Sequence, residues 1–215
     1  MQENSLQLSP ELLSGMKLHG FLLWASLGFL MPVGVLAIRV SRCEKFERRL
    51  GLILRVHAAL QIASAVVVTV AAAMSIKNFG NSFNNWHQRI GIVLYGAIWL
   101  QVLIGFLRPQ RQVSGGCKER KLWCSLHWAL GTALTLLGVI NIYTGLLAYH
   151  DMTSRSVKLW MILFTAEVTS VSVIYLFQDK WPYIRQQQQV NSLREEPIMP
   201  EMRLPFSKPK EEMMA

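Results

Sequence analysis

Five uninterrupted apolar stretches constrain this chain more than any other feature of its sequence. Each stretch contains 18 or more residues, and only the last one includes a formal charge, Glu167. The stretches are Leu18–Ile38, Val56–Ile76, Ile90–Leu107, Leu122–His150 and Leu159–Gln178. Crossing a bilayer core of about 30 Å takes about 20 helical residues, whereas a membrane β-barrel would show short alternating segments. The sequence therefore predicts an all-α membrane protein with five transmembrane helices.

The connections between these stretches carry unequal numbers of positive charges. Six Lys and Arg residues lie in the first connection, five in the third and six after the last stretch, against five on the opposite side. The positive-inside rule then predicts a non-cytoplasmic N-terminus and a cytoplasmic C-terminus. The net charge of +9 is explained by this topology. We therefore expect a membrane as the partner, and no nucleic acid.

The two ends of the chain differ in character from the apolar stretches. Met1–Lys17 is polar and shows no secretory signal pattern, although the first apolar stretch is long enough to act as a signal anchor. Beyond Gln178, glutamines, prolines and mixed charges predict disorder. We expect a polar segment over residues 1–15, a transmembrane domain over 16–180 and a disordered cytoplasmic tail over 181–215.

Four of the five histidines form an ordered set, with one near the N-terminal end of each of the first four helices. These residues are His19, His57, His87 and His127. Because successive helices alternate in direction, His19 and His87 share the outer half of the membrane, while His57 and His127 share the inner half. Alternate helices of a four-helix bundle face each other diagonally across its core. Each pair is therefore placed to supply both axial ligands of a haem iron.

A simpler reading of these histidines stays open on spacing alone. A single histidine near a membrane interface is more often an interfacial polar residue than a ligand, and we expect this role for His150. Against that, ionisable groups inside membranes are rare and tend to be functional. The two layers lie about 18–24 Å apart along the helices, so two haems would form a relay and one would not cross the membrane.

Three further features of the apolar stretches allow more than one reading. The glycines Gly131, Gly138 and Gly145 share a helix face, which favours close helix packing or a groove for a flat cofactor. Pro32 predicts a kink whose freed carbonyl is covered by neighbouring helices. Glu167 is expected to hydrogen-bond a core polar group such as Asn141 or Gln101, with a proton-coupled role as the alternative.

Several motifs resemble the cytochrome b561 family, most closely its plant branch that often carries an extracellular DOMON domain. The segment from His19 to Gly34, HGFLLWASLGFLMPVG, followed by Arg39, is similar to the first core helix of that family. Further similar segments are Val56–Gln61, His87–Ile92, Gln101–Leu103, Phe106–Pro109 and Leu126–Gly131. The resemblance covers residues 16–180 and includes the four histidines in order.

The resemblance implies a four-helix haem-binding core with one C-terminal peripheral helix. It implies two haem b groups, one held by His19 with His87 and the other by His57 with His127. It also implies a di-haem transmembrane oxidoreductase that passes electrons from a cytoplasmic reductant such as ascorbate to an outer acceptor. Monodehydroascorbate and a ferric chelate are the expected acceptors.

The sequence departs from the family in places that concern the donor and acceptor. No DOMON domain and no additional helix before the core are found, and Thr132 stands where the related branch often has arginine. We expect Arg39 to contact a haem propionate, and Arg48, Arg49 and Arg55 to bind the anionic donor. These arginines also set topology without any ligand.

Two other functions remain as alternatives to a self-sufficient reductase. One is a haem-free helical transporter or scaffold. The other is a haem-bearing subunit that relays electrons for a redox domain on another chain. A homodimer is compatible with either.

Overall fold

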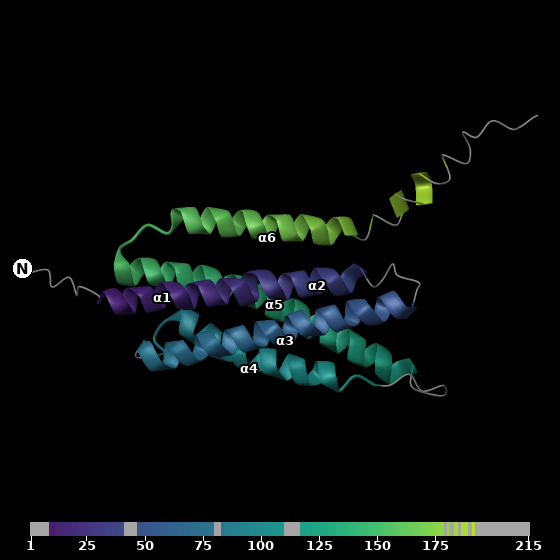
Figure 1. Ribbon diagram of the computed structural model, residues 1–215, viewed down its shortest axis with the longest axis horizontal. Coiled ribbons are helices and arrows are strands. Elements are labelled where there is room, and N and C mark those ends of the chain that lie inside the picture. Colours follow the sequence, from purple (N-terminus) through teal and green to yellow (C-terminus); the bar gives the residue numbers. More distant parts are fainter. Residues whose placement is uncertain are drawn as a thin grey trace, which may run out of the picture. The chain divides into compact units, whose positions relative to one another are not determined.

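The computed structural model describes residues 9–40, 47–79, 83–109 and 117–178, together with residues 180, 183–184, 186–188 and 191. The chain divides into two units, Met1–Gln178 and Asp179–Ala215. All of the long helices belong to the first unit (Figure 1). Most of the predicted tail over 181–215 falls outside the described residues.

The first unit contains five rods built from helix. The first rod runs from Pro10 to Val40 and consists of α1 (Pro10–Leu23), the π-helical η1 (Trp24–Leu30) and α2 (Met31–Val40). The other rods are α3 (Glu47–Asn78), α4 (Trp86–Phe106), α5 (Cys117–Thr153) and α6 (Lys158–Gln178). Each rod is long and apolar enough to cross a membrane, and no strand occurs in the described ranges. The predicted all-α fold with five membrane-spanning helices is confirmed.

Several helices extend well beyond the apolar stretches that predicted them. α1 begins at Pro10, where the Ser9 hydroxyl accepts a hydrogen bond from the Leu12 main-chain N–H at 3.2 Å. Such capping satisfies the first turn without any apolar residue, so a helix continues into polar flanks. As a result, only His87 lies at the start of its helix, while His19, His57 and His127 lie about three turns in. The expectation that all four lie near helix N-termini is therefore wrong for three of them.

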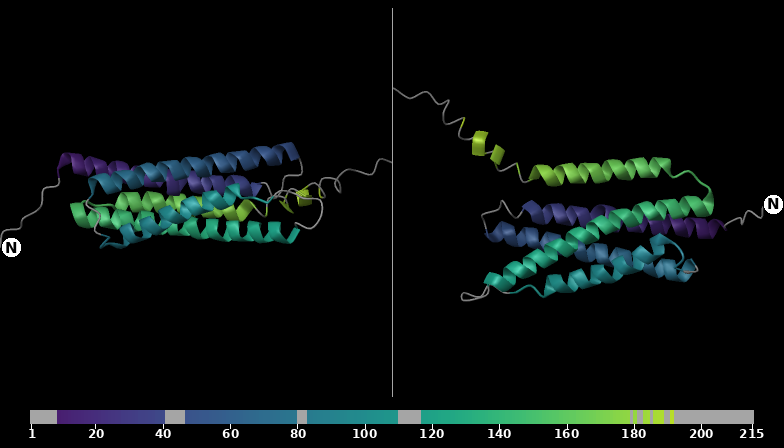
Figure 2. Two further views of the ribbon diagram at one scale, coloured as in Figure 1. Left: turned by 90° about the horizontal axis from the view of Figure 1, so that it is seen from below. Right: turned by 180° about the vertical axis from the view of Figure 1, so that it is seen from behind.

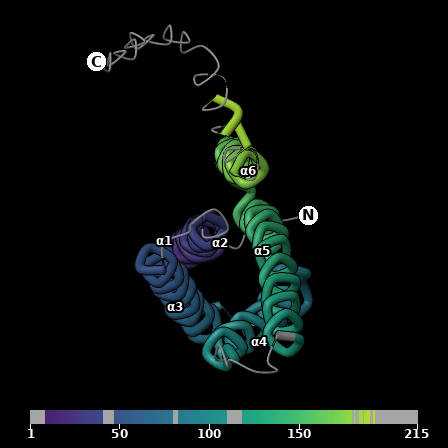
Figure 3. The backbone as a smooth tube through the Cα atoms, turned by 90° about the vertical axis from the view of Figure 1, so that its right-hand side faces the viewer, coloured from purple at the N-terminus to yellow at the C-terminus, as the bar shows by residue number. Residues whose placement is uncertain are grey.

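The first four rods form a ring, with α6 packed outside it. The first rod contacts α3 and α5, and α4 contacts the same two helices (Figure 2). The end-on view shows this order, with α6 beyond α5 and the first rod (Figure 3). The ring is filled by buried side chains, among them Leu27, Met31, Leu94, Ile98, Leu134 and Ile142. The first rod thus lies diagonally opposite α4, and α3 lies opposite α5.

The first rod is irregular near its middle, and α3 compensates for the irregularity. Pro32 has no N–H to donate, and η1 immediately precedes it, with the Met31 N–H reaching the Ser26 carbonyl. Ser26 and Ser64, both fully buried, hydrogen-bond reciprocally, so that the Ser64 hydroxyl also donates to the Ser26 carbonyl at 3.1 Å. α3 therefore contacts the main chain of η1 at Ser26, while the expected cover of the carbonyl that Pro32 leaves without a donor stays a prediction.

Candidate functional site: two histidine pairs

The ring brings the four histidines together as two pairs at different depths. His19 of α1 faces His87 of α4 with ring centres 6.0 Å apart and ring planes at 89°. His57 of α3 faces His127 of α5 with ring centres 6.4 Å apart and planes at 78°. Each pair joins diagonally opposite rods, which is the pairing that helix direction predicts.

The spacing of both pairs fits one metal ion between two imidazoles. A histidine nitrogen binds a transition metal at about 2.0–2.1 Å, and the ring centre lies about 1 Å behind that nitrogen, so two facing ligands place their ring centres about 6 Å apart. Among the described residues, no three His, Cys, Asp or Glu side chains gather to hold a bare metal ion. Two-histidine sites suit an iron whose other four ligands come from a macrocycle, as in haem.

Three of the four histidines are oriented by the main chain of a neighbouring helix. A carbonyl oxygen can only accept, so in each case Nδ1 carries the proton and donates it. The bonds run from His19 to Ala71 at 3.0 Å, from His57 to Gly34 at 2.8 Å and from His87 to Asn141 at 3.0 Å. This leaves Nε2 with its lone pair as the metal-binding atom, and the bond increases the basicity of the ligand.

His127 is held differently from the other three histidines. Its Nδ1 is buried and has no hydrogen-bond partner in the part of the chain that the structure describes. Instead, its ring stacks on the Trp123 indole, with ring centres 5.0 Å apart and planes at 7°. The Trp123 N–H donates to the Ile104 carbonyl of α4 at 2.9 Å, and the Gln101 amide donates to the His127 carbonyl at 2.7 Å. Sequence reasoning missed Trp123, although its spacing of four residues from His127 places both on one helix face.

The three evenly spaced glycines of α5 serve different purposes. A Cβ on Gly145 would lie 2.9 Å from Cε1 of His87, so this glycine makes room for a candidate ligand. A Cβ on Gly138 would lie 3.4 Å from Cβ of Leu27, which is close helix packing. The close-packing reading of the glycine pattern is confirmed at Gly138, whereas the groove for a flat cofactor stays a prediction.

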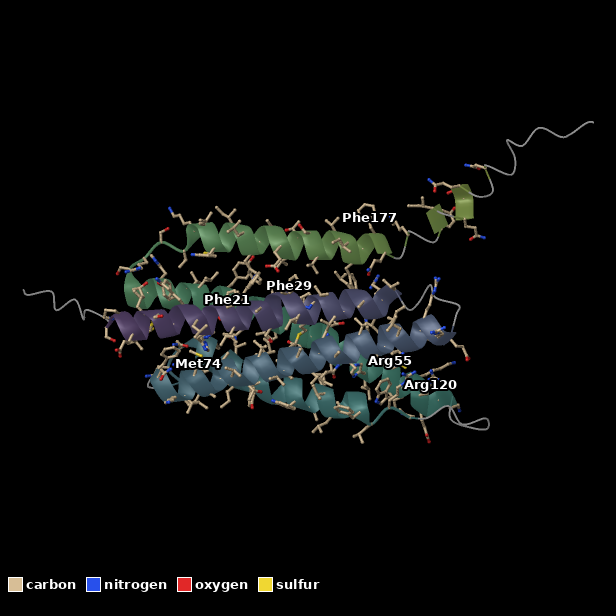
Figure 4. The ribbon with its side chains drawn as sticks, in the orientation of Figure 1. Phe21, Phe29, Arg55, Met74, Arg120 and Phe177 are labelled. Carbon is tan, nitrogen blue, oxygen red and sulfur yellow. The ribbon has the colours of Figure 1, made fainter. Side chains whose placement is uncertain are left out.

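The predicted arginines lie at the end of the ring where α2 ends and α3 begins. Arg39 is half-buried, with its guanidinium carbon 3.5 Å from the centre of the Tyr175 ring on α6. Arg48, Arg49 and Arg55 are exposed and line a shallow depression with Leu52. Figure 4 shows Arg55 of α3 at the same end as Arg120 of α5, with Met74 at the other end of α3. The three arginines of α3 thus lie on the same helix as His57, between its N-terminal end and this histidine.

Glu167 has a partner that the sequence did not predict. Its carboxylate accepts a hydrogen bond from the Trp24 indole at 2.7 Å. The expected bond to Asn141 or Gln101 is wrong because α6 packs outside the ring, where its carboxylate meets the outer side of the first rod. His150 is exposed in the last turn of α5, and its ring bonds the Arg155 carbonyl at 2.7 Å, so it lies at a helix end and not in a loop, and its interfacial role stays a prediction.

Comparison with known proteins relates this ring of helices to one family. The family model described as eukaryotic cytochrome b561 matches residues 18–177. A cytochrome b561 domain-containing protein of Arabidopsis thaliana is 47% identical over 191 residues, which cover 87% of this chain and 72% of that protein. No solved structure matches the chain.

Longer relatives match over the same region. A cytochrome b561 and DOMON domain-containing protein of Arabidopsis thaliana is 32% identical over 133 residues, covering 60% of this chain and 31% of that protein. A cytochrome b561, DM13 and DOMON domain-containing protein of the same plant is 23% identical over 149 residues, covering 68% of this chain and 16% of that protein. The similarity to these longer proteins therefore concerns a minor part of each.

Proposed function

This chain belongs to the eukaryotic cytochrome b561 family, and we propose that it passes electrons across a membrane between two haem b groups held by its histidine pairs. Membership of this family means that the chain is an integral membrane protein and that it takes part in haem-based electron transfer across the membrane. Both agree with the sequence prediction. The main support for the proposal is that two pairs of imidazoles face each other on diagonally opposite rods, with ring centres 6.0 Å apart in one pair and 6.4 Å apart in the other.

In this proposal the protein supplies ligation and separation. His19 and His87 would hold one haem, and His57 and His127 would hold the other, so that each haem would have two protein imidazoles as ligands. Haem supplies one-electron exchange between ferrous and ferric iron. A pair of imidazoles at each site would leave no room for oxygen to bind, so these residues favour electron transfer over oxygen chemistry.

The distribution of charge supports a proposal for the donor, and the family resemblance supports one for the acceptor. We propose that the end carrying Arg48, Arg49 and Arg55 faces the cytoplasm, with the N-terminus on the other side. Exposed guanidinium groups lining a depression suit an anionic reductant such as ascorbate. Arg39, half-buried at the same end, is proposed to pair with a haem propionate. The acceptor on the other side would be monodehydroascorbate or a ferric chelate.

Haem stoichiometry tests the core of this proposal. A reduced-minus-oxidised spectrum of the purified protein should show a b-type band, and quantitation should give two haems per chain. A colourless protein would overturn the proposal and favour the haem-free transporter or scaffold.

Vesicles that contain the protein and entrapped ascorbate test the donor and acceptor. They should reduce an external ferric chelate, with the donor concentration at half-maximal rate rising when Arg48 and Arg55 are both changed to Gln. Arg155→Gln, at the opposite end of the ring, is the matched control. A haem-loaded protein without ascorbate-driven reduction would instead favour a relay subunit. The homodimer stays a prediction, checked by light scattering in detergent.

A further inference from the structure

Among the described residues, Nδ1 of His127 has no partner, so no hydrogen bond from this atom fixes the plane of the imidazole. In the other three histidines, a main-chain carbonyl holds the ring at a set rotation. A metal–nitrogen bond permits rotation of the ring about its own axis, so a second contact is needed to fix the plane of the ligand. For His127, the Trp123 ring is the aromatic surface that lies parallel to it, at 7°.

Trp123 is itself anchored in a way that suits this task. Its N–H donates to the Ile104 carbonyl of α4 at 2.9 Å, so the indole bridges α5 and α4. Next to Ile104, a Cβ on Gly105 would lie 3.5 Å from Cε1 of His127, an ordinary contact distance, so α4 approaches the edge of the imidazole as well. The indole is therefore fixed by the protein main chain and presents its face to the histidine.

We propose that Trp123 is the positioning residue of the His57–His127 pair and sets the plane of the His127 imidazole by stacking, in place of a hydrogen bond at Nδ1. The inference rests on the proposed function, in which this pair binds a haem. An imidazole that does not donate from Nδ1 to a carbonyl is a weaker electron donor to iron than one that does. Because Nδ1 of His127 has no partner among the described residues, His127 would be the weaker electron donor of its pair.

Two variants of Trp123 distinguish the effect of an aromatic face stacked on His127 from the effect of side-chain volume alone. Trp123→Phe keeps an aromatic face, whereas Trp123→Leu removes it. In Trp123→Leu the imidazole loses the surface that fixes its plane, so the midpoint potential of this haem should shift and its low-spin ferric EPR signal should change in g-values. Trp123→Phe should stay close to the unmodified protein in both measurements. The matched control is Trp128→Leu, because Trp128 lies on the same helix and is exposed.

The haem at His57–His127 is identified as the signal lost in His127→Ala, and the signal of the other haem reports correct folding. A change confined to this haem in Trp123→Leu and absent in Trp123→Phe supports the inference. Equal behaviour of the two variants, or an equal change at both haems, overturns it. An unmodified protein without haem would instead refute the proposed function, so the two failures are distinguishable.

Discussion

The two histidine pairs share their ligand type and diagonal geometry but differ in how their rings are fixed. In the His19–His87 pair, both Nδ1 atoms donate to main-chain carbonyls, and Phe79 meets His19 edge-on with ring centres 5.5 Å apart. In the His57–His127 pair, only His57 has such a bond, and a side chain orients His127. A carbonyl cannot be removed by substitution, whereas an indole can. The second pair is therefore the one whose properties a single residue can adjust.

The largest expected effect separates the pairs outright. His87→Ala should remove the haem of the first pair and leave the other, whereas His127→Ala should do the reverse. Each variant loses one of the two imidazoles of a pair, and the described part of the structure shows no further histidine ring in contact with that pair that could replace it. Haem quantitation should fall from two per chain to one, with a different EPR signal missing in each case. Retention of both haems would contradict the pairing.

A smaller effect tests how tightly α5 and α4 approach the two rings. Gly145→Ala places a Cβ 2.9 Å from the His87 ring, while Gly105→Ala places one 3.5 Å from the His127 ring. Overpacking of this kind costs about 1–3 kcal/mol, so Gly145→Ala should weaken haem binding at the first pair by about 5- to 160-fold. Gly105→Ala should bind both haems normally, as measured by haem titration of the apoprotein. Equal losses in the two variants would show that the clearance at Gly145 has no special role.

A further variant acts between the pairs and should affect neither. Ser64→Ala removes the hydroxyl that bonds Ser26, but the Ser26 hydroxyl still donates to the main-chain carbonyl of residue 64, so the cost should be about 0.5–1.5 kcal/mol of unfolding free energy. Thermal unfolding should show the loss, while both haem spectra stay unchanged. Ser172→Ala, an exposed hydroxyl bonded within its own helix, is the control and should be near neutral. A shift in one haem would instead show that the serine contact sets the geometry of that pair.

The smallest effect is expected outside the ring. Glu167→Gln keeps an acceptor oxygen for the Trp24 indole and touches neither pair, so haem content should stay at the level of the unmodified protein. Loss of one haem, measured by the pyridine haemochrome assay, would show that α6 acts on the core.

The sequence was sufficient to predict the pairs because helix direction alone sorts His19 with His87 and His57 with His127. It was insufficient for the contacts that orient them. Trp123 reads as one more apolar residue, and its stacking depends on the rotation of α5 and on a carbonyl of α4. Hydropathy likewise marks the part of a helix suited to lipid, so it missed the capped extension of α1 to Pro10. The partner of Glu167 depends on where α6 packs, which no local pattern specifies.

The π-helical segment of the first rod keeps two depths in register. His57 and Ala71 are 14 positions apart on α3, and His127 and Asn141 are 14 positions apart on α5. On the first rod, His19 and Gly34 are 15 positions apart. A π-helical turn accommodates one extra residue. Because η1 contains such turns, His19 and Gly34 still face the same side of the rod despite the additional position. α3 and α5 are α-helical throughout and contain no π-helical turn over their described lengths. Insertion of one residue between His57 and Ala71 would turn one end by about 100° against the other, so the length of α3 is fixed to the residue.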